Sequence, residues 1–316
     1  MILVTGCAGF IGSHLCQALL RQGRKVVGID NFSPNYDRKL KEENLELLWQ
    51  HDNFEFLELC LSNCTQLATK NIDLVIHLAA TPGVVPSLTN IQHYIDNNIS
   101  RYNLLLDFME EQGIRKVIFA SSSSVYGNQS LKTYSETLIP APISPYGFTK
   151  QVGEQLNHQY HLVHGFSIIN LRLFSVYGNR MRPDLALPKF VDGLLQKQAI
   201  NLYNNGNDYR DFTHIKDIVI AFLKAIDYIE NANSCYETIN IGRGIPVKIL
   251  DVVSCLERIT GKKIKRNYTL KRQGEPLYTC SNIERAKELL DYSPTILLEE
   301  GLLSYWNWRV ADKINV

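Results

Sequence analysis

A tyrosine and a lysine stand four residues apart in the segment Tyr146-Gly147-Phe148-Thr149-Lys150. Side chains at this spacing lie on one face of a helix, so this phenol and this ammonium can act on the same chemical group. A nearby cation lowers the pKa of a phenol and lets the phenol act as a base at neutral pH. The pattern also arises by chance as an exposed helix pair, so its interpretation depends on the rest of the chain.

Four consecutive serines occupy residues 121–124, directly after an apolar segment that ends at Ala120. A run of serines can simply be a solvated loop. Hydroxyl groups at the carboxyl end of a buried parallel strand, however, lie in the crevice where α/β enzymes bind their ligands. We therefore interpret these serines, Tyr146 and Lys150 as parts of one site.

Three glycines, Gly6, Gly9 and Gly12, lie between the apolar residues 2–4 and a stretch with helical spacing. Glycine lets the backbone adopt conformations that other residues avoid, and it lets the backbone approach a pyrophosphate closely. The helix that follows offers unpaired N–H groups to the anion. A glycine triplet alone is weak evidence, but its position between a strand and a helix predicts dinucleotide binding.

Asp30 ends the second predicted strand, residues 26–29. A carboxylate at this point can accept hydrogen bonds from both hydroxyls of an adenosine ribose and would repel a 2′-phosphate. An aspartate can also serve as a helix N-cap or as a turn residue. Its place in the glycine pattern favours the first interpretation, and so NAD over NADP.

The composition excludes several classes of protein. The 316 residues include 33 lysines and arginines against 32 aspartates and glutamates, a net charge of +1, whereas nucleic-acid binders usually show a basic excess. The 7 cysteines form no C-x-x-C pair, which argues against a disulfide framework or a zinc site and for reduced thiols. No segment reads as a secretory signal or as a membrane span. We expect a soluble, cytoplasmic protein that binds no metal and no membrane.

Short apolar segments alternate with helical patterns through the first half of the chain. This alternation predicts βαβ units and a parallel sheet covered on both faces. The expected fold class is α/β, a Rossmann-type doubly wound parallel sheet with a smaller α/β substrate domain. The predicted strands are residues 2–4, 26–29, 54–57, 74–77, 117–120 and 167–171, and the predicted helices include residues 11–22, 88–112 and 145–163.

The sequence pattern changes after about residue 172, where prolines and glycines divide the chain into shorter segments. We therefore predict two domains. Residues 1–171 form the NAD-binding domain, to which residues 213–240 return with a helix at 215–230. Residues 172–316 form the substrate domain.

Further short motifs follow one another in a fixed order. They are Phe10-Ile11-Gly12-Ser13-His14, His77-Leu78-Ala79-Ala80, Asn98, Ser175-Val176-Tyr177-Gly178, Arg182-Pro183-Asp184, Arg210-Asp211-Phe212, Asn240-Ile241-Gly242 and Gly274-Glu275-Pro276. With these motifs the chain resembles the extended short-chain dehydrogenase/reductase family, in particular its NAD-dependent sugar-nucleotide epimerases and dehydratases. It is most similar to the UDP-glucuronate 4-epimerases, and the resemblance covers nearly the whole chain.

The resemblance implies a mechanism and a cofactor site. Ser122 and Tyr146 would bind the 4-OH of the sugar, and Lys150 would adjust the pKa of Tyr146. Tyr146 would remove the 4-OH proton while hydride leaves C4 for NAD⁺, and the 4-keto sugar would turn over and take the hydride back on its other face. The residues that the resemblance implies for cofactor binding are Gly6, Gly9, Phe10, Ile11, Gly12, Asp30, Asn31, Leu78, Ala79, Ala80, Asn98, Tyr146 and Lys150.

Several reactions are known on this fold, so the residues beside the catalytic hydroxyl must distinguish them. The related 4,6-dehydratases carry Asp and Glu directly after that hydroxyl, and the UDP-glucuronate decarboxylases carry a Glu two residues after it. This chain has Ser123 and Ser124 at those positions, and neither can do such acid–base work at neutral pH. Epimerisation is therefore the better interpretation, with the decarboxylase and the dehydratase as less favoured alternatives.

The resemblance also implies how the substrate is held. Ser123, Ser124, Ser175 and Arg182 match residues that hold the C6 carboxylate, which favours UDP-glucuronate over UDP-glucose or UDP-N-acetylglucosamine. Arg182 can instead be a surface arginine or pair with Asp184. Arg210 is the candidate for the diphosphate, with Asp211 as a residue that can lock it. The uridine would lie near Arg272 and Glu275.

Two positions depart from the family pattern. Val85 stands where related enzymes often carry Arg, and Cys60 stands where Asp or Asn commonly touches the adenine. The resemblance implies a homodimer through the long helices. Leu104, Leu105, Phe108, Leu156 and Tyr160 permit that contact or can face the chain's own sheet.

Two other classes of protein remain as alternatives. An NAD-binding scaffold without turnover is disfavoured by the intact set of Ser122, Tyr146 and Lys150. A net reductase, which often uses NADPH, is disfavoured by Asp30.

Overall fold

The computed structural model describes residues 1–314. A seven-stranded sheet forms its centre, and every neighbouring pair of strands is parallel, in the order β10-β6-β5-β4-β1-β2-β3. The fold class that the alternating pattern predicts is therefore confirmed. The strands are β1 (Ile2–Thr5), β2 (Val26–Asp30), β3 (Phe54–Glu58), β4 (Leu74–His77), β5 (Lys116–Ser122), β6 (Ser167–Leu173) and β10 (Tyr236–Ile241).

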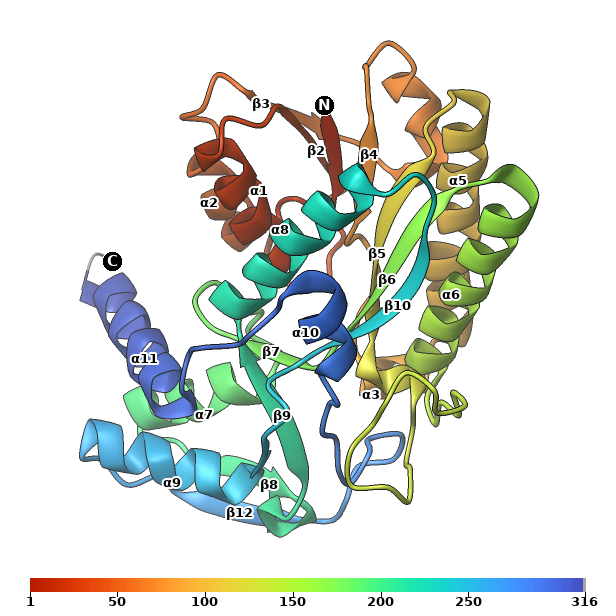
Figure 1. Cartoon of the computed structure of the whole chain (residues 1–316). Coiled ribbons are helices and arrows are strands. Elements are labelled where there is room, and N and C mark those ends of the chain that lie inside the picture. Colours follow the sequence, from red (N-terminus) through yellow and green to blue (C-terminus); the bar gives the residue numbers. More distant parts are fainter. Residues whose placement is uncertain (315–316) are drawn as a thin grey trace.

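Helices cover both faces of this sheet (Figure 1). On one face, α1 (Phe10–Arg21) and α8 (Ile215–Asn231) pack with Ile2 and Val4 of β1. On the other face, α5 (Arg101–Glu111), the 3₁₀ helix at Leu61–Leu67 and the start of β1 at Leu3 share a second core, which α6 (Pro145–His164) closes with Tyr160. Successive side chains of a strand point to opposite faces, so a strand buried on both faces carries apolar residues on both.

The remaining elements build a smaller layer beside the sheet. Three strands form one sheet, two parallel strands form another, and a separate apolar core fills the space between them and their helices. Its elements are β7 (Ser175–Tyr177), α7 (Ala186–Gln196), β8 (Ile200–Tyr203), β9 (Tyr209–His214), β11 (Pro246–Lys248), α9 (Ile249–Thr260), β12 (Arg266–Thr269) and α11 (Leu298–Ile314). Short α10 (Glu284–Leu290) packs on α8 and β10 instead.

The predicted helix over residues 88–112 is present without a break from Ile91 to Glu111, so it begins later than predicted and contains an irregular turn. Two short helices, α3 (Val84–Ser87) and α4 (Ile91–Ile95), are separated by Asn90, whose φ of −140° and ψ of 57° are not helical. A π-helical turn, Asp96–Ser100, then joins α4 to α5. Propensity does not reveal this turn, because a single i→i+5 turn arises from local packing and often lies at functional sites.

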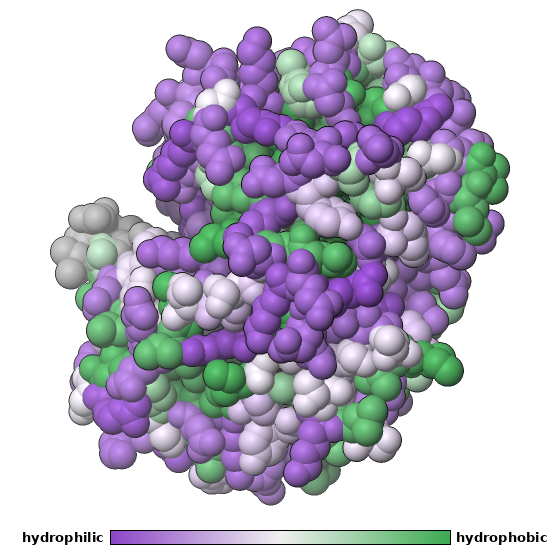
Figure 2. Space-filling model, in the orientation of Figure 1, coloured by the Kyte–Doolittle hydropathy of each residue, from purple (hydrophilic) through white to green (hydrophobic). Residues whose placement is uncertain are grey.

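The chain reverses direction across the sheet between β1 and β4, because β2 and β3 lie on one side of β1 and the later strands lie on the other. Open α/β sheets bind ligands in the crevice at such a point. Within residues 1–314, no helix is long and apolar enough to cross a membrane. The surface is largely polar, and one apolar patch lies over the C-terminal end of α6, at the right edge of Figure 2.

The turn after β1 depends on a close approach between glycines. Gly6 has a φ of 73°, and a Cβ on Gly12 would lie 2.2 Å from the carbonyl oxygen of Gly6. No side chain fits at Gly12 unless α1 moves away from the turn.

We therefore expect Gly12→Ala to lower the free energy of unfolding by about 1–3 kcal/mol, because α1 must shift to relieve the overlap. Urea denaturation followed by circular dichroism measures this change. Arg21→Ala, at an exposed position of the same helix, is the matched control. Equal stabilities of the two variants would contradict the packing argument.

Candidate active site

A cavity of about 1210 Å³ runs along the carboxyl edge of the large sheet and reaches the smaller layer. The ends of β1, β2, β4, β5 and β6 line one wall, and segments after residue 175 line the other. The cavity brings together every substrate residue predicted from the sequence. These are Ser123, Ser124, Ser175, Arg182, Arg210, Arg272 and Glu275.

The glycine turn forms one end of this cavity. Gly9 is the N-cap of α1 and has no side chain to satisfy the first N–H groups of the helix, so these groups and the positive end of the helix dipole are available to an anion. The backbone after β4 lies against the turn, and a Cβ on Gly6 would be 3.0 Å from the amide nitrogen of Ala79. Together these residues form a backbone cradle that suits a pyrophosphate.

Asp30 is buried at the same end and is held by a lysine that the sequence analysis did not single out. Its Oδ1 accepts a hydrogen bond from the backbone N–H of Phe32 at 2.8 Å and pairs with Nζ of Lys41 at 3.2 Å. No hydrogen bond within residues 1–314 uses its Oδ2, which can therefore accept a ribose hydroxyl. Lys41 balances the negative charge of Asp30, so Asp30 repels a 2′-phosphate only weakly. The preference for NAD over NADP therefore depends mainly on the free acceptor oxygen of Asp30.

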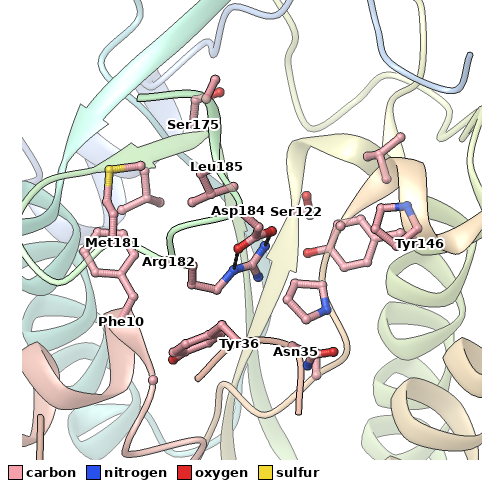
Figure 3. A pocket seen from close by; sticks show the side chains of 18 of the residues that line it. Phe10, Asn35, Tyr36, Ser122, Tyr146, Ser175, Met181, Arg182, Asp184 and Leu185 are labelled. Atoms are coloured by element: carbon pink, nitrogen blue, oxygen red, sulfur yellow. Dashed lines mark hydrogen bonds and ion pairs between the residues drawn. The ribbon is translucent and has the colours of Figure 1, made fainter. Parts of the chain in front are cut away.

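Tyr146 and Lys150 lie on one face of α6, opposite the end of β5. The phenol of Tyr146 points toward Ser122 (Figure 3). Lys150 is 4% exposed, and its ammonium group donates a hydrogen bond to the carbonyl oxygen of Ala120 at 2.7 Å. Both side chains line the cavity together with Ser122.

The helix can come this close because of Gly147. A Cβ at this position would lie 2.4 Å from the carbonyl oxygen of Ser124. The backbone N–H of Tyr146 is also fixed, because it donates to the hydroxyl of Ser87 in α3 at 3.1 Å. The phenol is therefore positioned from two elements.

The predicted net lowering of the Tyr146 pKa is wrong for this structure. Burial raises its pKa, while the nearby hydroxyl of Ser122 and the charge of Arg182 act in the opposite direction. Burial also lowers the pKa of Lys150 to about 8, opposed by the charge of Glu154. The spacing of a tyrosine and a lysine shows their proximity, but it does not show how much water both groups lose.

Asn98 supports the cavity from behind and is not among the residues that line it, and its contact with the cofactor stays a prediction. It is 3% exposed, and its amide nitrogen donates to the carbonyl oxygen of Thr81 and to the hydroxyl of Thr149, both at 3.0 Å. Its Oδ1 accepts from the backbone N–H of Thr81 at 2.7 Å. Asn98 therefore joins the segment after β4 to α6.

Arg182 both lines the cavity and pairs with Asp184, so the two interpretations of this residue are compatible. Its Nε and Nη2 lie 3.0 and 2.8 Å from the two carboxylate oxygens of Asp184. Figure 3 shows the pair between Tyr36 and Ser175, on the side of the cavity that faces Tyr146. A second carboxylate at this place has to share or replace Asp184 as the partner of Arg182.

Arg210 is not locked by Asp211, which corrects that interpretation. Asp211 accepts hydrogen bonds from the backbone N–H groups of Arg243, Gly244 and Ser281 at 2.9, 3.0 and 2.9 Å. Arg210 instead lies 3.8 Å from carboxylate oxygens of both Asp208 and Glu275.

Arg272 stacks on an aromatic ring of the smaller layer. Its guanidinium carbon is 3.5 Å from the ring centroid of Tyr203, and its Nη1 lies 3.4 Å from Glu275. Strand β9, which carries Arg210, and the loop that carries Arg272 therefore meet at Glu275.

Sequence reasoning missed several residues that line the cavity. They come from the loop after β2, from α2 (Arg38–Glu46) and from the α7–β8 segment, and they include Asn35, Tyr36, Lys41, Lys189, Asn201 and Tyr203. Most of them sit in polar or mixed segments that resemble ordinary surface. Val85 and Cys60, the two departures from the family pattern, also line the cavity. Within residues 1–314, no group of three or more His, Cys, Asp or Glu side chains could hold a metal ion.

Comparison with known proteins places these features in a family. Residues 2–242 match the NAD dependent epimerase/dehydratase family. The UDP-glucuronate 4-epimerase of Thermodesulfobacterium geofontis is 38% identical over 97% of this chain and 95% of its own length.

Solved structures agree with that match. The UDP-glucuronic acid 4-epimerase of Bacillus cereus, crystallised with UDP-glucuronic acid and NAD, is 41% identical, with a TM-score of 0.93 over 98% of this chain and 99% of that one. A UDP-glucose 4-epimerase of Thermotoga maritima, crystallised with UDP-glucose, is 30% identical, with a TM-score of 0.89 over 99% of both chains. The chain belongs to the NAD-dependent epimerase/dehydratase family.

Proposed function

We propose that this protein is an NAD-dependent UDP-sugar 4-epimerase and that its substrate is UDP-glucuronate, which it converts to UDP-galacturonate. The observation that carries the proposal is the group of Ser122, Tyr146 and Lys150 at the cavity wall, followed by serines at 123 and 124. The same trio followed by carboxylic acids would favour a dehydratase or a decarboxylase.

In the proposed mechanism, Tyr146 loses its own proton to solvent, and the resulting phenolate takes the proton of the sugar 4-OH, which Ser122 orients through a hydrogen bond. Lys150 keeps a positive charge next to this proton transfer and makes the phenolate easier to form. A bound NAD would supply the hydride acceptor and donor at C4, so the 4-keto sugar would be transient and no net oxidation would occur. The cradle of Gly6, Gly9, Phe10, Ile11 and Gly12 would hold its pyrophosphate.

Other residues complete the proposed cofactor site. Asp30 would accept the adenosine ribose hydroxyls, with Asn31 beside it. The backbone of Leu78, Ala79 and Ala80 would border the nicotinamide half. We assign NAD binding to residues 1–171 with 213–240, and substrate binding to residues 172–316.

We propose that Ser123, Ser124, Ser175 and Arg182 recognise the C6 carboxylate. Hydroxyl and guanidinium groups donate strong hydrogen bonds to a carboxylate, and all four residues line the cavity. Arg210 would contact the diphosphate, and Arg272 with Glu275 would lie at the uridine. UDP-glucose and UDP-N-acetylglucosamine are the alternative substrates, because a neutral C6 group requires none of these charges.

We expect turnover to fall as the pH rises above about 8. The pKa of Lys150 is lowered to about 8, so its charge is present below that pH and is lost above it. The pKa of Tyr146 is raised, so the phenol needs that charge to act as a base. A pH profile of kcat measures this, with Lys150→Met as the control that lacks the alkaline limb. A wild-type profile that stays flat well above pH 8 would count against the role of Lys150.

We expect Arg182→Leu to weaken the binding of UDP-glucuronate by about 10- to 100-fold, because a charge-assisted hydrogen bond is lost. Calorimetric Kd values for UDP-glucuronate and UDP-glucose test the substrate assignment. The Kd of UDP-glucose should stay within about 3-fold, because a neutral C6 group makes no ion pair. Equal losses for both sugars would contradict the carboxylate role of Arg182.

We also propose a cytoplasmic location, which the seven free cysteines support, and a homodimer through α5 and α6. Leu105, Phe108 and Tyr160 are buried in the chain's own core and Leu156 packs against it, which leaves Leu104 as the candidate contact among those predicted. Leu104 is 44% exposed. Exposed apolar residues on α4 and α6 extend its surface, namely Ile91, Phe148, Leu162 and Val163.

Leu104→Glu should therefore shift the sedimentation coefficient from that of a dimer to that of a single chain, because a carboxylate would be buried in an apolar contact. Leu270→Glu is the matched control, since Leu270 is 91% exposed in a loop away from these helices. A wild-type protein that sediments as a single chain, or a Leu104→Glu variant that stays dimeric, would argue against this interface.

A further inference from the structure

A buried ion pair lies directly behind the proposed catalytic group. Glu154 of α6 and Arg172 of β6 have side chains that are 8% and 6% exposed. Nε and Nη2 of Arg172 donate to the two carboxylate oxygens of Glu154 at 2.9 and 2.6 Å. This forked contact is the geometry in which an arginine binds a carboxylate most strongly.

The pair is joined to both catalytic elements. Glu154 lies one helical turn after Lys150, and it also accepts a hydrogen bond from the hydroxyl of Ser121, the residue before Ser122. Lys150 itself donates to Ala120, the next residue back along β5. One carboxylate therefore fixes the end of β5 and the face of α6 that carries Tyr146.

Arg172 extends the network to a third strand. Its Nη1 donates to the hydroxyl of Tyr126 at 2.9 Å, and that hydroxyl donates to Oδ1 of Asn240 in β10 at 2.7 Å. The amide nitrogen of Asn240 donates to the carbonyl oxygen of Tyr134 at 2.8 Å. The network spans β5, β6, β10 and α6. It meets the cavity at Ser121, whereas neither Glu154 nor Arg172 lines the cavity.

We infer that Glu154 and Arg172 form a positioning pair that keeps Ser122 and Lys150 in register and keeps Lys150 charged during catalysis. The inference rests on the proposed function, in which Lys150 assists Tyr146. A buried ion pair is weak evidence for stability, because apolar residues of similar size often do as well. This pair, however, lies behind Lys150, where it supplies a negative charge that apolar residues could not supply.

The groups that surround Lys150 leave Glu154 as its source of negative charge. His77 of β4 is fully buried, and burial holds its pKa well below the usual range, so it is neutral. Tyr146 of α6 and Ser122 of β5 are neutral in the resting state, and Arg172 of β6 is a cation. Burial lowers the pKa of Lys150 and Glu154 raises it, so removal of the carboxylate makes the loss of the proton easier.

Glu154→Gln tests this inference in the NAD-bound protein. The amide keeps an acceptor for Ser121 and Arg172 but removes the negative charge. We expect the fall in kcat at alkaline pH to begin about one pH unit lower than in the wild type, a tenfold change in proton concentration. The KM for UDP-glucuronate should change by less than about 3-fold. Glu154→Asp keeps the charge, so its limb should stay at the wild-type pH even if kcat falls.

A matched control separates this role from a structural one. Glu257 of α9 is also buried, and it pairs with Arg266 of β12 at 2.8 Å, remote from Lys150. Glu257→Gln should lower the melting temperature without moving the alkaline limb. If Glu154→Gln behaves like Glu257→Gln, with a lower melting temperature and an unmoved limb, the inference is overturned.

Two further measurements keep the test decisive. If Glu154→Gln does not fold, Glu154→Gln/Arg172→Gln removes both charges, and its limb should also move to lower pH; an unmoved limb overturns the inference. The pKa of Lys150 can also be read without turnover, from the ¹³Cε shift of labelled lysine assigned with Lys150→Arg. A lower Lys150 pKa in Glu154→Gln supports the pair even if no UDP-sugar is epimerised, and an unchanged pKa contradicts it.

Discussion

The approach of α6 to β5 is the contact on which the proposed site depends. At Gly147 and at Gly153 an added Cβ would overlap with Ser124 and Phe119 of the strand side, at 2.4 and 2.5 Å. The helix therefore lies close enough for Tyr146 to reach Ser122 and for Lys150 to reach the carbonyl oxygen of Ala120. A shift of about 1 Å in such a contact is enough to lose much of the rate that depends on orientation.

The same edge of the sheet provides the cofactor cradle and faces the smaller layer. The cradle needs backbone N–H groups and an acceptor at Asp30, whereas the far wall supplies Arg182, Arg210 and Arg272. The chain therefore separates two tasks. A buried, closely packed sheet holds the proposed reacting groups, and β9 and the loops of the smaller layer carry the charges that we propose recognise a nucleotide sugar.

Local sequence patterns predict much of the fold and of the candidate site. The glycine turn, Asp30 and the Tyr146–Lys150 spacing are short motifs whose geometry follows from a strand or a helix. Contacts between distant segments were not predictable in the same way. Lys41 as the partner of Asp30, the backbone partners of Asp211 and the supporting role of Asn98 arise only when the chain folds. The raised pKa of Tyr146 depends on burial, which residue spacing does not reveal.

The most direct test of the central claim is the fate of UDP-glucuronate incubated with the purified protein, followed by ¹H NMR of the sugar ring. We expect a product with an axial C4 hydroxyl and a retained C6 carboxylate, without release of CO₂ and without consumption of added NADH. A pentose product would contradict the argument drawn from Ser123 and Ser124, and turnover of neutral UDP-sugars alone would contradict the carboxylate site at Arg182.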